Sequence, residues 1–265
     1  MSDYLKTFFI AILQGITEWL PVSSTGHMII LEEYLALDVS EEFGDLFLAV
    51  VQLGSALAVL VRYFERLNPI KILESHESRG LWKNIVIASL PAVIVGLLLD
   101  DEIEKLFYNH FSVAIVLMFY GVVFLLADAF AKRRGPGDSL SEMSSLRAAF
   151  VGAFQALALI PGTSRSGVTV IGGMISGCDR KSAAEFSFYL SLPIMLGASA
   201  LRVMKYGFGL SSKEVVILTI GTTVAFLVSL VVIDLLVQLV SRHGFAAFGV
   251  YRIILGVIII TVSKA

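Results

Sequence analysis

Apolar residues run through this 265-residue chain in long blocks, and charged residues fall mainly between the blocks. A transmembrane helix needs about 20 mostly apolar residues, and roughly 17 are enough. Six blocks approach this length and are predicted to be spans: 46–61, 84–99, 106–127, 186–201, 215–233 and 246–263, the last interrupted by Arg252. The pattern therefore predicts an all-α polytopic membrane protein.

Two further apolar regions are too interrupted to cross a bilayer. Each has two arms around a break: 7–17 and 19–31 around Glu18 and Pro21, and 148–160 and 166–178 around Pro161, Gly162 and Arg165. A helical arm of this length reaches only ~16–20 Å, whereas the hydrocarbon core is about 30 Å thick. Both regions are predicted to be re-entrant helix–break–helix hairpins. A cleavable secretory leader is the alternative for the first one, but Glu18 and Trp19 disfavour it.

The two halves of the chain repeat the same order, one broken hairpin followed by three spans. The segment 21–26 (PVSSTG) is similar to 161–167 (PGTSRSG). Three spans is an odd number, so the second copy would enter the membrane upside down. This predicts an inverted repeat, about 1–130 and about 146–265, within a single membrane domain, 1–265. Such folds bind their ligands near the midplane where broken helices meet.

Basic residues between the spans predict the orientation. The 62–83 and 128–147 loops are rich in Lys and Arg, whereas the 32–45 loop has six acidic residues and no basic one. The first two loops are predicted to lie inside and the third outside, with both termini outside. The 202–214 loop, predicted outside, carries three basic residues and fits less well. The 100–110 segment is expected to be a short loop.

Composition supports a membrane protein. Hydrophobic residues make up 57% of the chain and charged residues 16%, against about 25% charged residues in a soluble domain. The net charge of −2 offers no basic surface for nucleic acid. Cys178 is the single cysteine, which excludes a disulfide framework and a thiolate metal cluster.

Polar side chains gather at the two breaks, where they are costly and usually functional. The first break offers Gln14, Glu18, Ser23, Ser24, Thr25 and His27, and the second Thr163, Ser164, Arg165, Ser166 and Thr169. Gln14 and Glu18 are four residues apart and so share a helix face. Gln52, within an apolar span, either lines this site or bonds to a neighbouring helix.

These residue types suit a phosphate-bearing ligand. Arginine forks onto phosphate oxygens, and the hydroxyl and free N–H groups of a glycine-containing break bind anions. Carboxylate and amide oxygens are ligands for Mg²⁺ or Ca²⁺, and histidine is a nucleophile or general acid. Taken singly, Ser23 and Ser166 would fit helix caps, His27 a packed side chain and Arg165 a headgroup contact. Their joint occurrence at two similar breaks predicts a phosphoryl-transfer site for a lipid substrate.

Two stretches carry a resemblance to a known family. Residues 14–27 (QGITEWLPVSSTGH) resemble the first signature of the bacterial undecaprenyl-diphosphate phosphatases, the bacitracin-resistance family. Residues 161–169 (PGTSRSGVT) match its second signature, and 183–188 (AAEFSF) is also similar. Gln14 stands where many members have Glu, which leaves one charge fewer for a metal.

The resemblance implies a hydrolase that converts undecaprenyl diphosphate to undecaprenyl phosphate and inorganic phosphate. It would act on the outer, periplasmic side of the bacterial inner membrane, need Mg²⁺ or Ca²⁺, recycle the lipid for peptidoglycan synthesis and confer bacitracin resistance. Glu18 and Gln14 would hold the cation, and Arg165 would bind the diphosphate. The other predicted substrate contacts are Ser23, Thr25, Gln52, Thr163, Ser164, Ser166 and Thr169. The nucleophile would be His27 or Ser24.

Two other classes stay open at this point. Inverted repeats with broken helices are typical of carriers, so a transporter or flippase of a lipid phosphate or another anion is the main alternative. A scaffold subunit would leave the polar breaks unexplained. The oligomeric state, a homodimer included, is left open.

Overall fold

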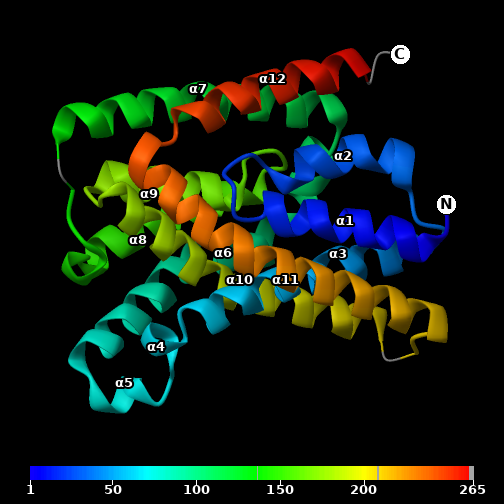
Figure 1. Cartoon of the computed structure of the whole chain (residues 1–265), viewed down its shortest axis with the longest axis horizontal. Helices are drawn as coiled ribbons and strands as arrows, with labels where there is room; N and C mark the ends of the chain where they lie inside the picture. The colour runs from blue at the N-terminus through cyan, green and yellow to red at the C-terminus, as the bar shows by residue number, and fades with distance from the viewer. Residues whose placement is uncertain (136, 208, 263–265) are drawn as a thin grey trace.

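The computed structural model describes residues 1–135, 137–207 and 209–262, except for the side chains at 32, 33, 73, 74, 100, 101 and 104. These residues form helices that lie side by side along the long axis (Figure 1). In chain order they are α1 (Asp3–Thr17), α2 (Ser24–Leu35), α3 (Glu41–Arg62), α4 (Phe64–Leu67), α5 (Lys71–Glu74), α6 (His76–Phe107), α7 (His110–Arg134), η1 (Leu140–Glu142), α8 (Ser145–Ala156), η2 (Leu157–Leu159), α9 (Arg165–Ser176), α10 (Arg180–Tyr206), α11 (Ser212–His243) and α12 (Ala246–Val262).

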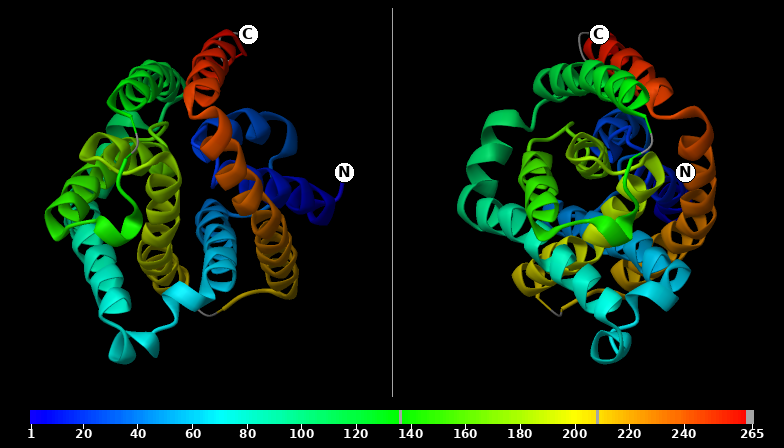
Figure 2. Two further views of the ribbon diagram at one scale, coloured as in Figure 1. Left: turned by 60° about the vertical axis from the view of Figure 1, so that its left-hand side comes forward. Right: turned by 90° about the vertical axis from the view of Figure 1, so that its left-hand side faces the viewer.

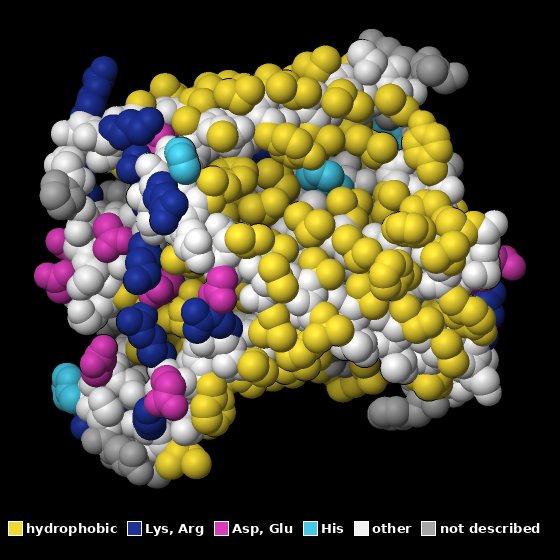
Figure 3. Space-filling view, in the orientation of Figure 1, with side chains coloured by type: hydrophobic (Ala, Val, Ile, Leu, Met, Phe, Trp, Pro, Cys, Tyr) yellow, Lys and Arg dark blue, Asp and Glu magenta, His cyan; other side chains and the backbone are white. Residues whose placement is uncertain are grey.

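Five helices are long and apolar enough to cross a membrane, namely α3, α6, α7, α10 and α11. They contain four of the six predicted spans, and α7 contains most of a fifth, 106–127, whose first residues belong to the end of α6 and the turn after it. The protein is a multi-pass membrane protein. The predicted span 246–263 corresponds to α12, and residue 263 lies outside the described residues. The 17 residues of α12 reach about 25 Å. That this helix crosses the membrane therefore stays a prediction. Figure 3 shows hydrophobic side chains over the middle of one face and charged ones gathered near α4 and α5.

The expected loop at 100–110 is wrong. Helix α6 continues to Phe107, and α7 begins at His110 after a short turn. The Asn109 side chain caps α7 by accepting a hydrogen bond from the Ser112 N–H at 2.9 Å. The acidic residues that suggested a loop thus continue a helix, because no proline or glycine ends it before this cap.

The two predicted hairpins are confirmed as helix–break–helix units, α1–α2 and α8–η2–α9. They enter from opposite ends of the molecule, and their breaks lie near its middle (Figures 1 and 2). The second arm of each begins at a capping serine. Ser23 accepts a hydrogen bond from the Gly26 N–H, and Ser164 accepts one from the Gly167 N–H. These caps satisfy N–H groups that a helix break leaves without partners.

The first arms pack on long helices of the opposite half, α1 on α11 and α8 on α6. Each contact contains a glycine that permits close approach. An added Cβ would lie 2.9 Å from the Ala225 carbonyl oxygen at Gly15 and 2.6 Å from the Ala88 carbonyl oxygen at Gly152. In addition, α3 packs on α10 and α7 on α12. The pairs correspond between the predicted halves, while the inverted repeat and the domain bounds stay predictions.

The basic loops share one end of the molecule. Helices α4 and α5 lie at the same end as the C-terminus of α7, and the N-terminus lies at the opposite end with the last turn of α12 (Figure 1). This arrangement agrees with the predicted placement of the 62–83 and 128–147 loops on one side. Which end faces the cytoplasm stays a prediction.

Candidate active site between the two helix breaks

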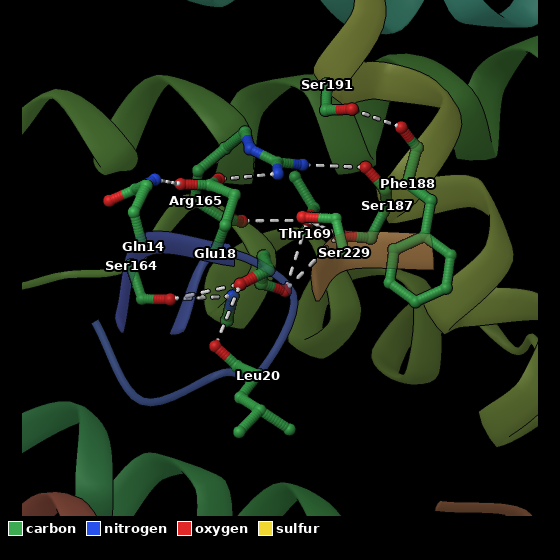
Figure 4. A network of polar contacts seen from close by, with 12 residues as sticks. Gln14, Glu18, Leu20, Ser164, Arg165, Thr169, Ser187, Phe188, Ser191 and Ser229 are labelled. Carbon is green, nitrogen blue, oxygen red and sulfur yellow. Dashed lines mark hydrogen bonds and ion pairs between the residues drawn. The ribbon is translucent and has the colours of Figure 1, made fainter. Parts of the chain in front are cut away.

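The two breaks meet through a buried ion pair. The Arg165 guanidinium at the start of α9 donates from Nη2 to Glu18 Oε1, just after α1, at 3.0 Å. Gln14 donates from Nε2 to Glu18 Oε2 at 2.7 Å, which confirms the predicted shared face. The Glu18 and Arg165 side chains are only 6% and 11% exposed. Such a buried pair is stable only when hydrogen bonds satisfy most of its remaining polar groups. Figure 4 shows the guanidinium held from two sides, while its Nε has no hydrogen-bond partner among the described residues.

The second side of this cradle comes from α10. Arg165 Nη1 donates to the Ser187 carbonyl oxygen at 2.7 Å. The Arg165 guanidinium also lies 5.8 Å from the centre of the Trp19 ring, within cation–π range. Trp19 in turn meets Phe188 edge to face at 5.3 Å. The arginine is therefore fixed in orientation by one carboxylate, one carbonyl and one ring.

The hydroxyl groups of Ser164, Ser166 and Thr169 at the second break are bonded within the protein. The Ser166 hydroxyl donates to the Leu20 carbonyl oxygen at 3.4 Å and lies 3.2 Å from the Ser164 hydroxyl. The Thr169 hydroxyl donates to the Arg165 carbonyl oxygen at 2.8 Å. It also lies 2.7 Å from the Ser187 hydroxyl. Ser166, Thr169 and Thr163 are buried. In this structure these three side chains support the break from inside, and their predicted substrate contacts stay predictions.

Two serines carry backbone strain at corresponding places. Ser23 has φ 70° and Ser164 has φ 73°, and among the described residues they alone, apart from glycines, have positive φ. Such strain costs on the order of 1–3 kcal/mol and tends to occur at functional sites. Here each serine turns the chain into the second arm and caps it, so that the N–H groups of that arm are directed toward the break.

A cavity of about 670 Å³ adjoins the first break. The polar residues on its wall include Gln14, Ser24, Thr25 and Gln52, alongside apolar residues such as Met28. Its lining continues to the acidic segment after α2 and to the ion pair between Arg202 and Asp45, whose Nη1 and Oδ2 are 2.7 Å apart. Gln52 thus lines the cavity, and its predicted contact with substrate stays a prediction. A polar wall beside apolar residues fits a ligand with a charged head and a lipid tail.

His27 bonds to Ser23 and to Tyr251 of α12. Its Nδ1 is 2.7 Å from the Ser23 carbonyl oxygen, so Nδ1 carries the proton and donates. Its Nε2 therefore accepts from the Tyr251 hydroxyl at 2.7 Å, and the two rings stack with centres 5.7 Å apart. Both ring nitrogens are engaged, whereas Ser24 lies on the cavity wall. Of the two predicted nucleophiles, Ser24 is therefore the one that the cavity reaches in this conformation.

Sequence reasoning missed Tyr251 and Arg252 of α12. Arg252 was treated only as an interruption of a predicted span, yet it is fully buried and donates to backbone carbonyls of both breaks. The signal was present, because an isolated arginine in an apolar segment is a functional candidate by default. Tyr251 left no comparable signal, since its contact with His27 depends on how α12 packs on α2.

The residues fit a divalent cation only together with substrate. The predicted ligands are the Glu18 carboxylate and the Gln14 amide oxygen, and both Glu18 oxygens already accept hydrogen bonds. Within the described residues, no cluster of three or more His, Cys, Asp or Glu could hold a metal. Mg²⁺ is commonly bound by one or two carboxylates plus substrate phosphates. The donor set therefore suits a cation whose coordination a diphosphate completes.

These features define a class: a polytopic helical membrane protein whose polar site forms where two helix breaks meet. Residues 7–258 match the family described as Bacitracin resistance protein BacA. The chain belongs to this family. It is 46% identical over 265 residues to an undecaprenyl-diphosphatase of Acetivibrio thermocellus, covering 98% of this chain and 97% of that protein. It is 46% identical to undecaprenyl-diphosphatase 1 of Clostridioides difficile (98% and 96% covered) and 41% identical to an undecaprenyl-diphosphatase of Enterococcus faecalis (98% and 97%).

Proposed function

We propose that this protein removes the terminal phosphate of undecaprenyl diphosphate and releases undecaprenyl phosphate and inorganic phosphate. The observation that carries this proposal is the buried contact between Glu18 and Arg165 across the two breaks. It joins an acid and a planar cation, and Gln14, which bonds to Glu18, lines the cavity with polar and apolar walls. Phosphoryl transfer depends mainly on positioning and on neutralising oxygen charge, and these residues supply both. The names of the relatives favour this activity over transport.

Arg165 is the residue that binds the diphosphate. Its two terminal nitrogens bond to Glu18 and Ser187 in this structure, and each has a second N–H group. These second N–H groups donate to phosphate oxygens when substrate enters. Thr25 and Gln52 line the cavity beside the first break, from which they donate to the phosphates. Ser164 and Ser166 hold the second break in place and donate from its edge.

Ser24 is the favoured nucleophile. Its Oγ attacks the terminal phosphorus, the bond from that phosphorus to the bridging oxygen breaks, and undecaprenyl phosphate leaves. Water then hydrolyses the phosphoserine to give inorganic phosphate. His27 lies three residues further along α2, on the same face of the helix. It takes the Ser24 proton at Nε2 once this atom leaves the Tyr251 hydroxyl, as a nucleophile–base pair requires.

A divalent cation, Mg²⁺ or Ca²⁺, would be held by Glu18 and the Gln14 amide oxygen together with the diphosphate. Bound there, it would neutralise charge on the phosphate oxygens. Glu18 would serve both the cation and Arg165, since its two oxygens bond separately to Gln14 and Arg165 in this structure.

The reaction takes place at the outer face of the bacterial inner membrane. Two observations support this: the cavity extends to the acidic segment after α2, and the basic loops lie at the opposite end of the molecule. Basic loops favour the cytoplasmic side. The product then re-enters peptidoglycan synthesis as the carrier lipid, which reduces sensitivity to bacitracin.

The experiment is phosphate release from a long-chain prenyl diphosphate by the purified protein. We expect turnover with Mg²⁺ or Ca²⁺, loss of turnover with EDTA and recovery when the cation is returned. Glu18→Ala and Arg165→Ala should each lose activity by about 10³-fold, while Arg133→Ala, at an exposed side chain in the last turn of α7, should keep it. Substrate that crosses vesicle membranes without being cleaved would instead support the transporter.

A further inference from the structure

Arg252 is a buried cation without a described acidic partner. It lies in α12 and its side chain is among the largest that are fully buried. No ion pair involves it in the described part of the chain, and its Nε has no hydrogen-bond partner there. An unpaired charge in a low-dielectric interior is costly unless its donors are satisfied in another way. The remaining donors of Arg252 therefore indicate why it is there.

Those donors reach both helix breaks. Arg252 Nη1 donates to the Pro21 carbonyl oxygen of the first break at 3.3 Å. Its Nη2 donates to the Gly162 and Thr163 carbonyl oxygens of the second break at 2.8 and 2.9 Å. One guanidinium thus bridges two segments that are about 140 residues apart in sequence. Carbonyls freed at a break within a membrane need such donors.

Two aromatic rings of α7 complete the environment. The guanidinium carbon lies 5.9 Å from the centre of the Tyr120 ring and 5.8 Å from that of Phe124. Cation–π contacts offset part of the cost of removing the charge from water. Since α7 packs on α12, the arginine is held between two packed helices and not on a loop.

We infer that Arg252 is a positioning residue that holds the two breaks in register for phosphoryl transfer. Glu18 lies three residues before Pro21, and Arg165 lies two residues after Thr163. Moving either carbonyl would therefore change the separation of the two site residues. The inference rests on the proposed function for its effect on catalysis, but its structural part can be tested without substrate.

The planar fork explains why an arginine occupies this position. Its two terminal nitrogens point in fixed, different directions. One therefore reaches the first break and the other reaches the second. A lysine keeps the charge but is a single donor point on a flexible stem. A glutamine keeps donor hydrogens but loses the charge and the reach. Arg252→Lys and Arg252→Gln therefore separate positioning from charge.

The first measurement is hydrogen exchange by mass spectrometry on the detergent-solubilised protein. We expect both variants to raise exchange about tenfold in peptides covering 18–26 and 160–168, with α3 and α11 unchanged. The matched control is Arg242→Lys, an exposed arginine near the end of α11, which should leave every peptide unchanged. Unchanged exchange in the two breaks would overturn the inference, as would an equal rise throughout the protein.

The second measurement is steady-state kinetics of phosphate release. We expect Arg252→Lys and Arg252→Gln each to lower kcat by about 10²-fold, with KM changed less than about threefold because Arg165 still binds phosphate. If Arg252→Lys kept full activity while Arg252→Gln lost it, charge alone would matter and the positioning role would be wrong. If the wild type released no phosphate, the proposed function would fail, while the exchange result would still decide whether Arg252 aligns the breaks.

A third variant approaches the same contact from its other partner. Gly162 has φ 91°, and an added Cβ would lie 2.8 Å from the Val113 carbonyl oxygen, so Gly162→Ala should displace the carbonyl that Arg252 binds. If both changes act through this contact, the double variant Gly162→Ala/Arg252→Lys should lose little more activity than the worse single one. Fully multiplicative losses would contradict the inference.

Discussion

The two hairpins share a backbone but not their chemistry. In each, a serine with φ near 70° is followed by two residues and then a glycine whose N–H bonds to the serine hydroxyl. Counted from these serines, Ser24 of the first hairpin corresponds to Arg165 of the second, and His27 corresponds to Val168. The same turn thus presents a hydroxyl and an imidazole on one side and a guanidinium on the other.

This comparison shows how a duplicated break can build an asymmetric site. The acid and the nucleophile candidates belong to the first hairpin, and the arginine belongs to the second, so neither hairpin is sufficient alone. The shared turn gives both hairpins the same backbone geometry, and the different side chains on it give each hairpin a different chemical role. Variants that affect only one hairpin, or both equally, can test this separation.

The largest effect should come from Ser24→Ala. Removing a nucleophile commonly costs 10⁴-fold or more, so we expect a loss of about that size. Mass spectrometry after a rapid acid quench should detect a phosphoserine in the wild type. The same measurement should find none in the Ser24→Ala variant. Thr25→Ala, at a neighbouring hydroxyl of the same cavity, should lose only about tenfold. An alkali-stable phosphohistidine on the wild type would instead make His27 the nucleophile.

The next effect tests whether the hairpins act as one unit. Glu18→Gln and Arg165→Gln should each lower kcat/KM by about 10³-fold. The double variant should lose little more than either, because each single change already breaks the contact between the breaks. Phosphate-release kinetics on the four proteins measure the coupling. Multiplicative losses would mean that the two residues contribute separately to the reaction.

Much of this arrangement could be predicted from sequence. Four apolar blocks lie within membrane-length helices and a fifth lies mostly within one, both broken regions are hairpins, and Gln14 shares a face with Glu18. These features depend on local spacing, which periodicity and proline positions record. The meeting of the breaks followed from the repeated order of elements.

The remaining contacts depend on information that local patterns do not contain. Arg252 binds backbone carbonyls. Because every residue has a backbone carbonyl, the sequence does not indicate which residues Arg252 contacts. Aligning the halves on Pro21 and Pro161 also shifts the correspondence by one residue, because the structures coincide at Ser23 and Ser164 instead. Backbone conformation, and not the proline, fixes which side chains are equivalent.

A smaller and more symmetric effect should come from the strained serines. Ser23→Ala and Ser164→Ala each lose a cap while keeping positive φ, so each should destabilise the protein by about 1–2 kcal/mol. Ser23→Gly and Ser164→Gly lose the cap but accept the conformation, so they should cost less than the alanine variants. Thermal unfolding in detergent measures all four. Unequal costs at the two serines would show that the shared turn is not equally strained in both hairpins.

The smallest effect should come from Tyr251→Phe. This change removes the hydroxyl that bonds to His27 Nε2 of the first hairpin. Phenylalanine keeps the stacked ring, and the Ser23 carbonyl still fixes the proton on Nδ1. We therefore expect kcat to change by no more than about fivefold, the value of a single hydrogen bond. His27→Ala should lose far more, because it removes the base itself. If Tyr251→Phe lowered kcat as much as His27→Ala, the tyrosine would be part of the proton transfer. Helix α12 would then contribute acid–base chemistry as well as alignment to a site otherwise divided between the two hairpins.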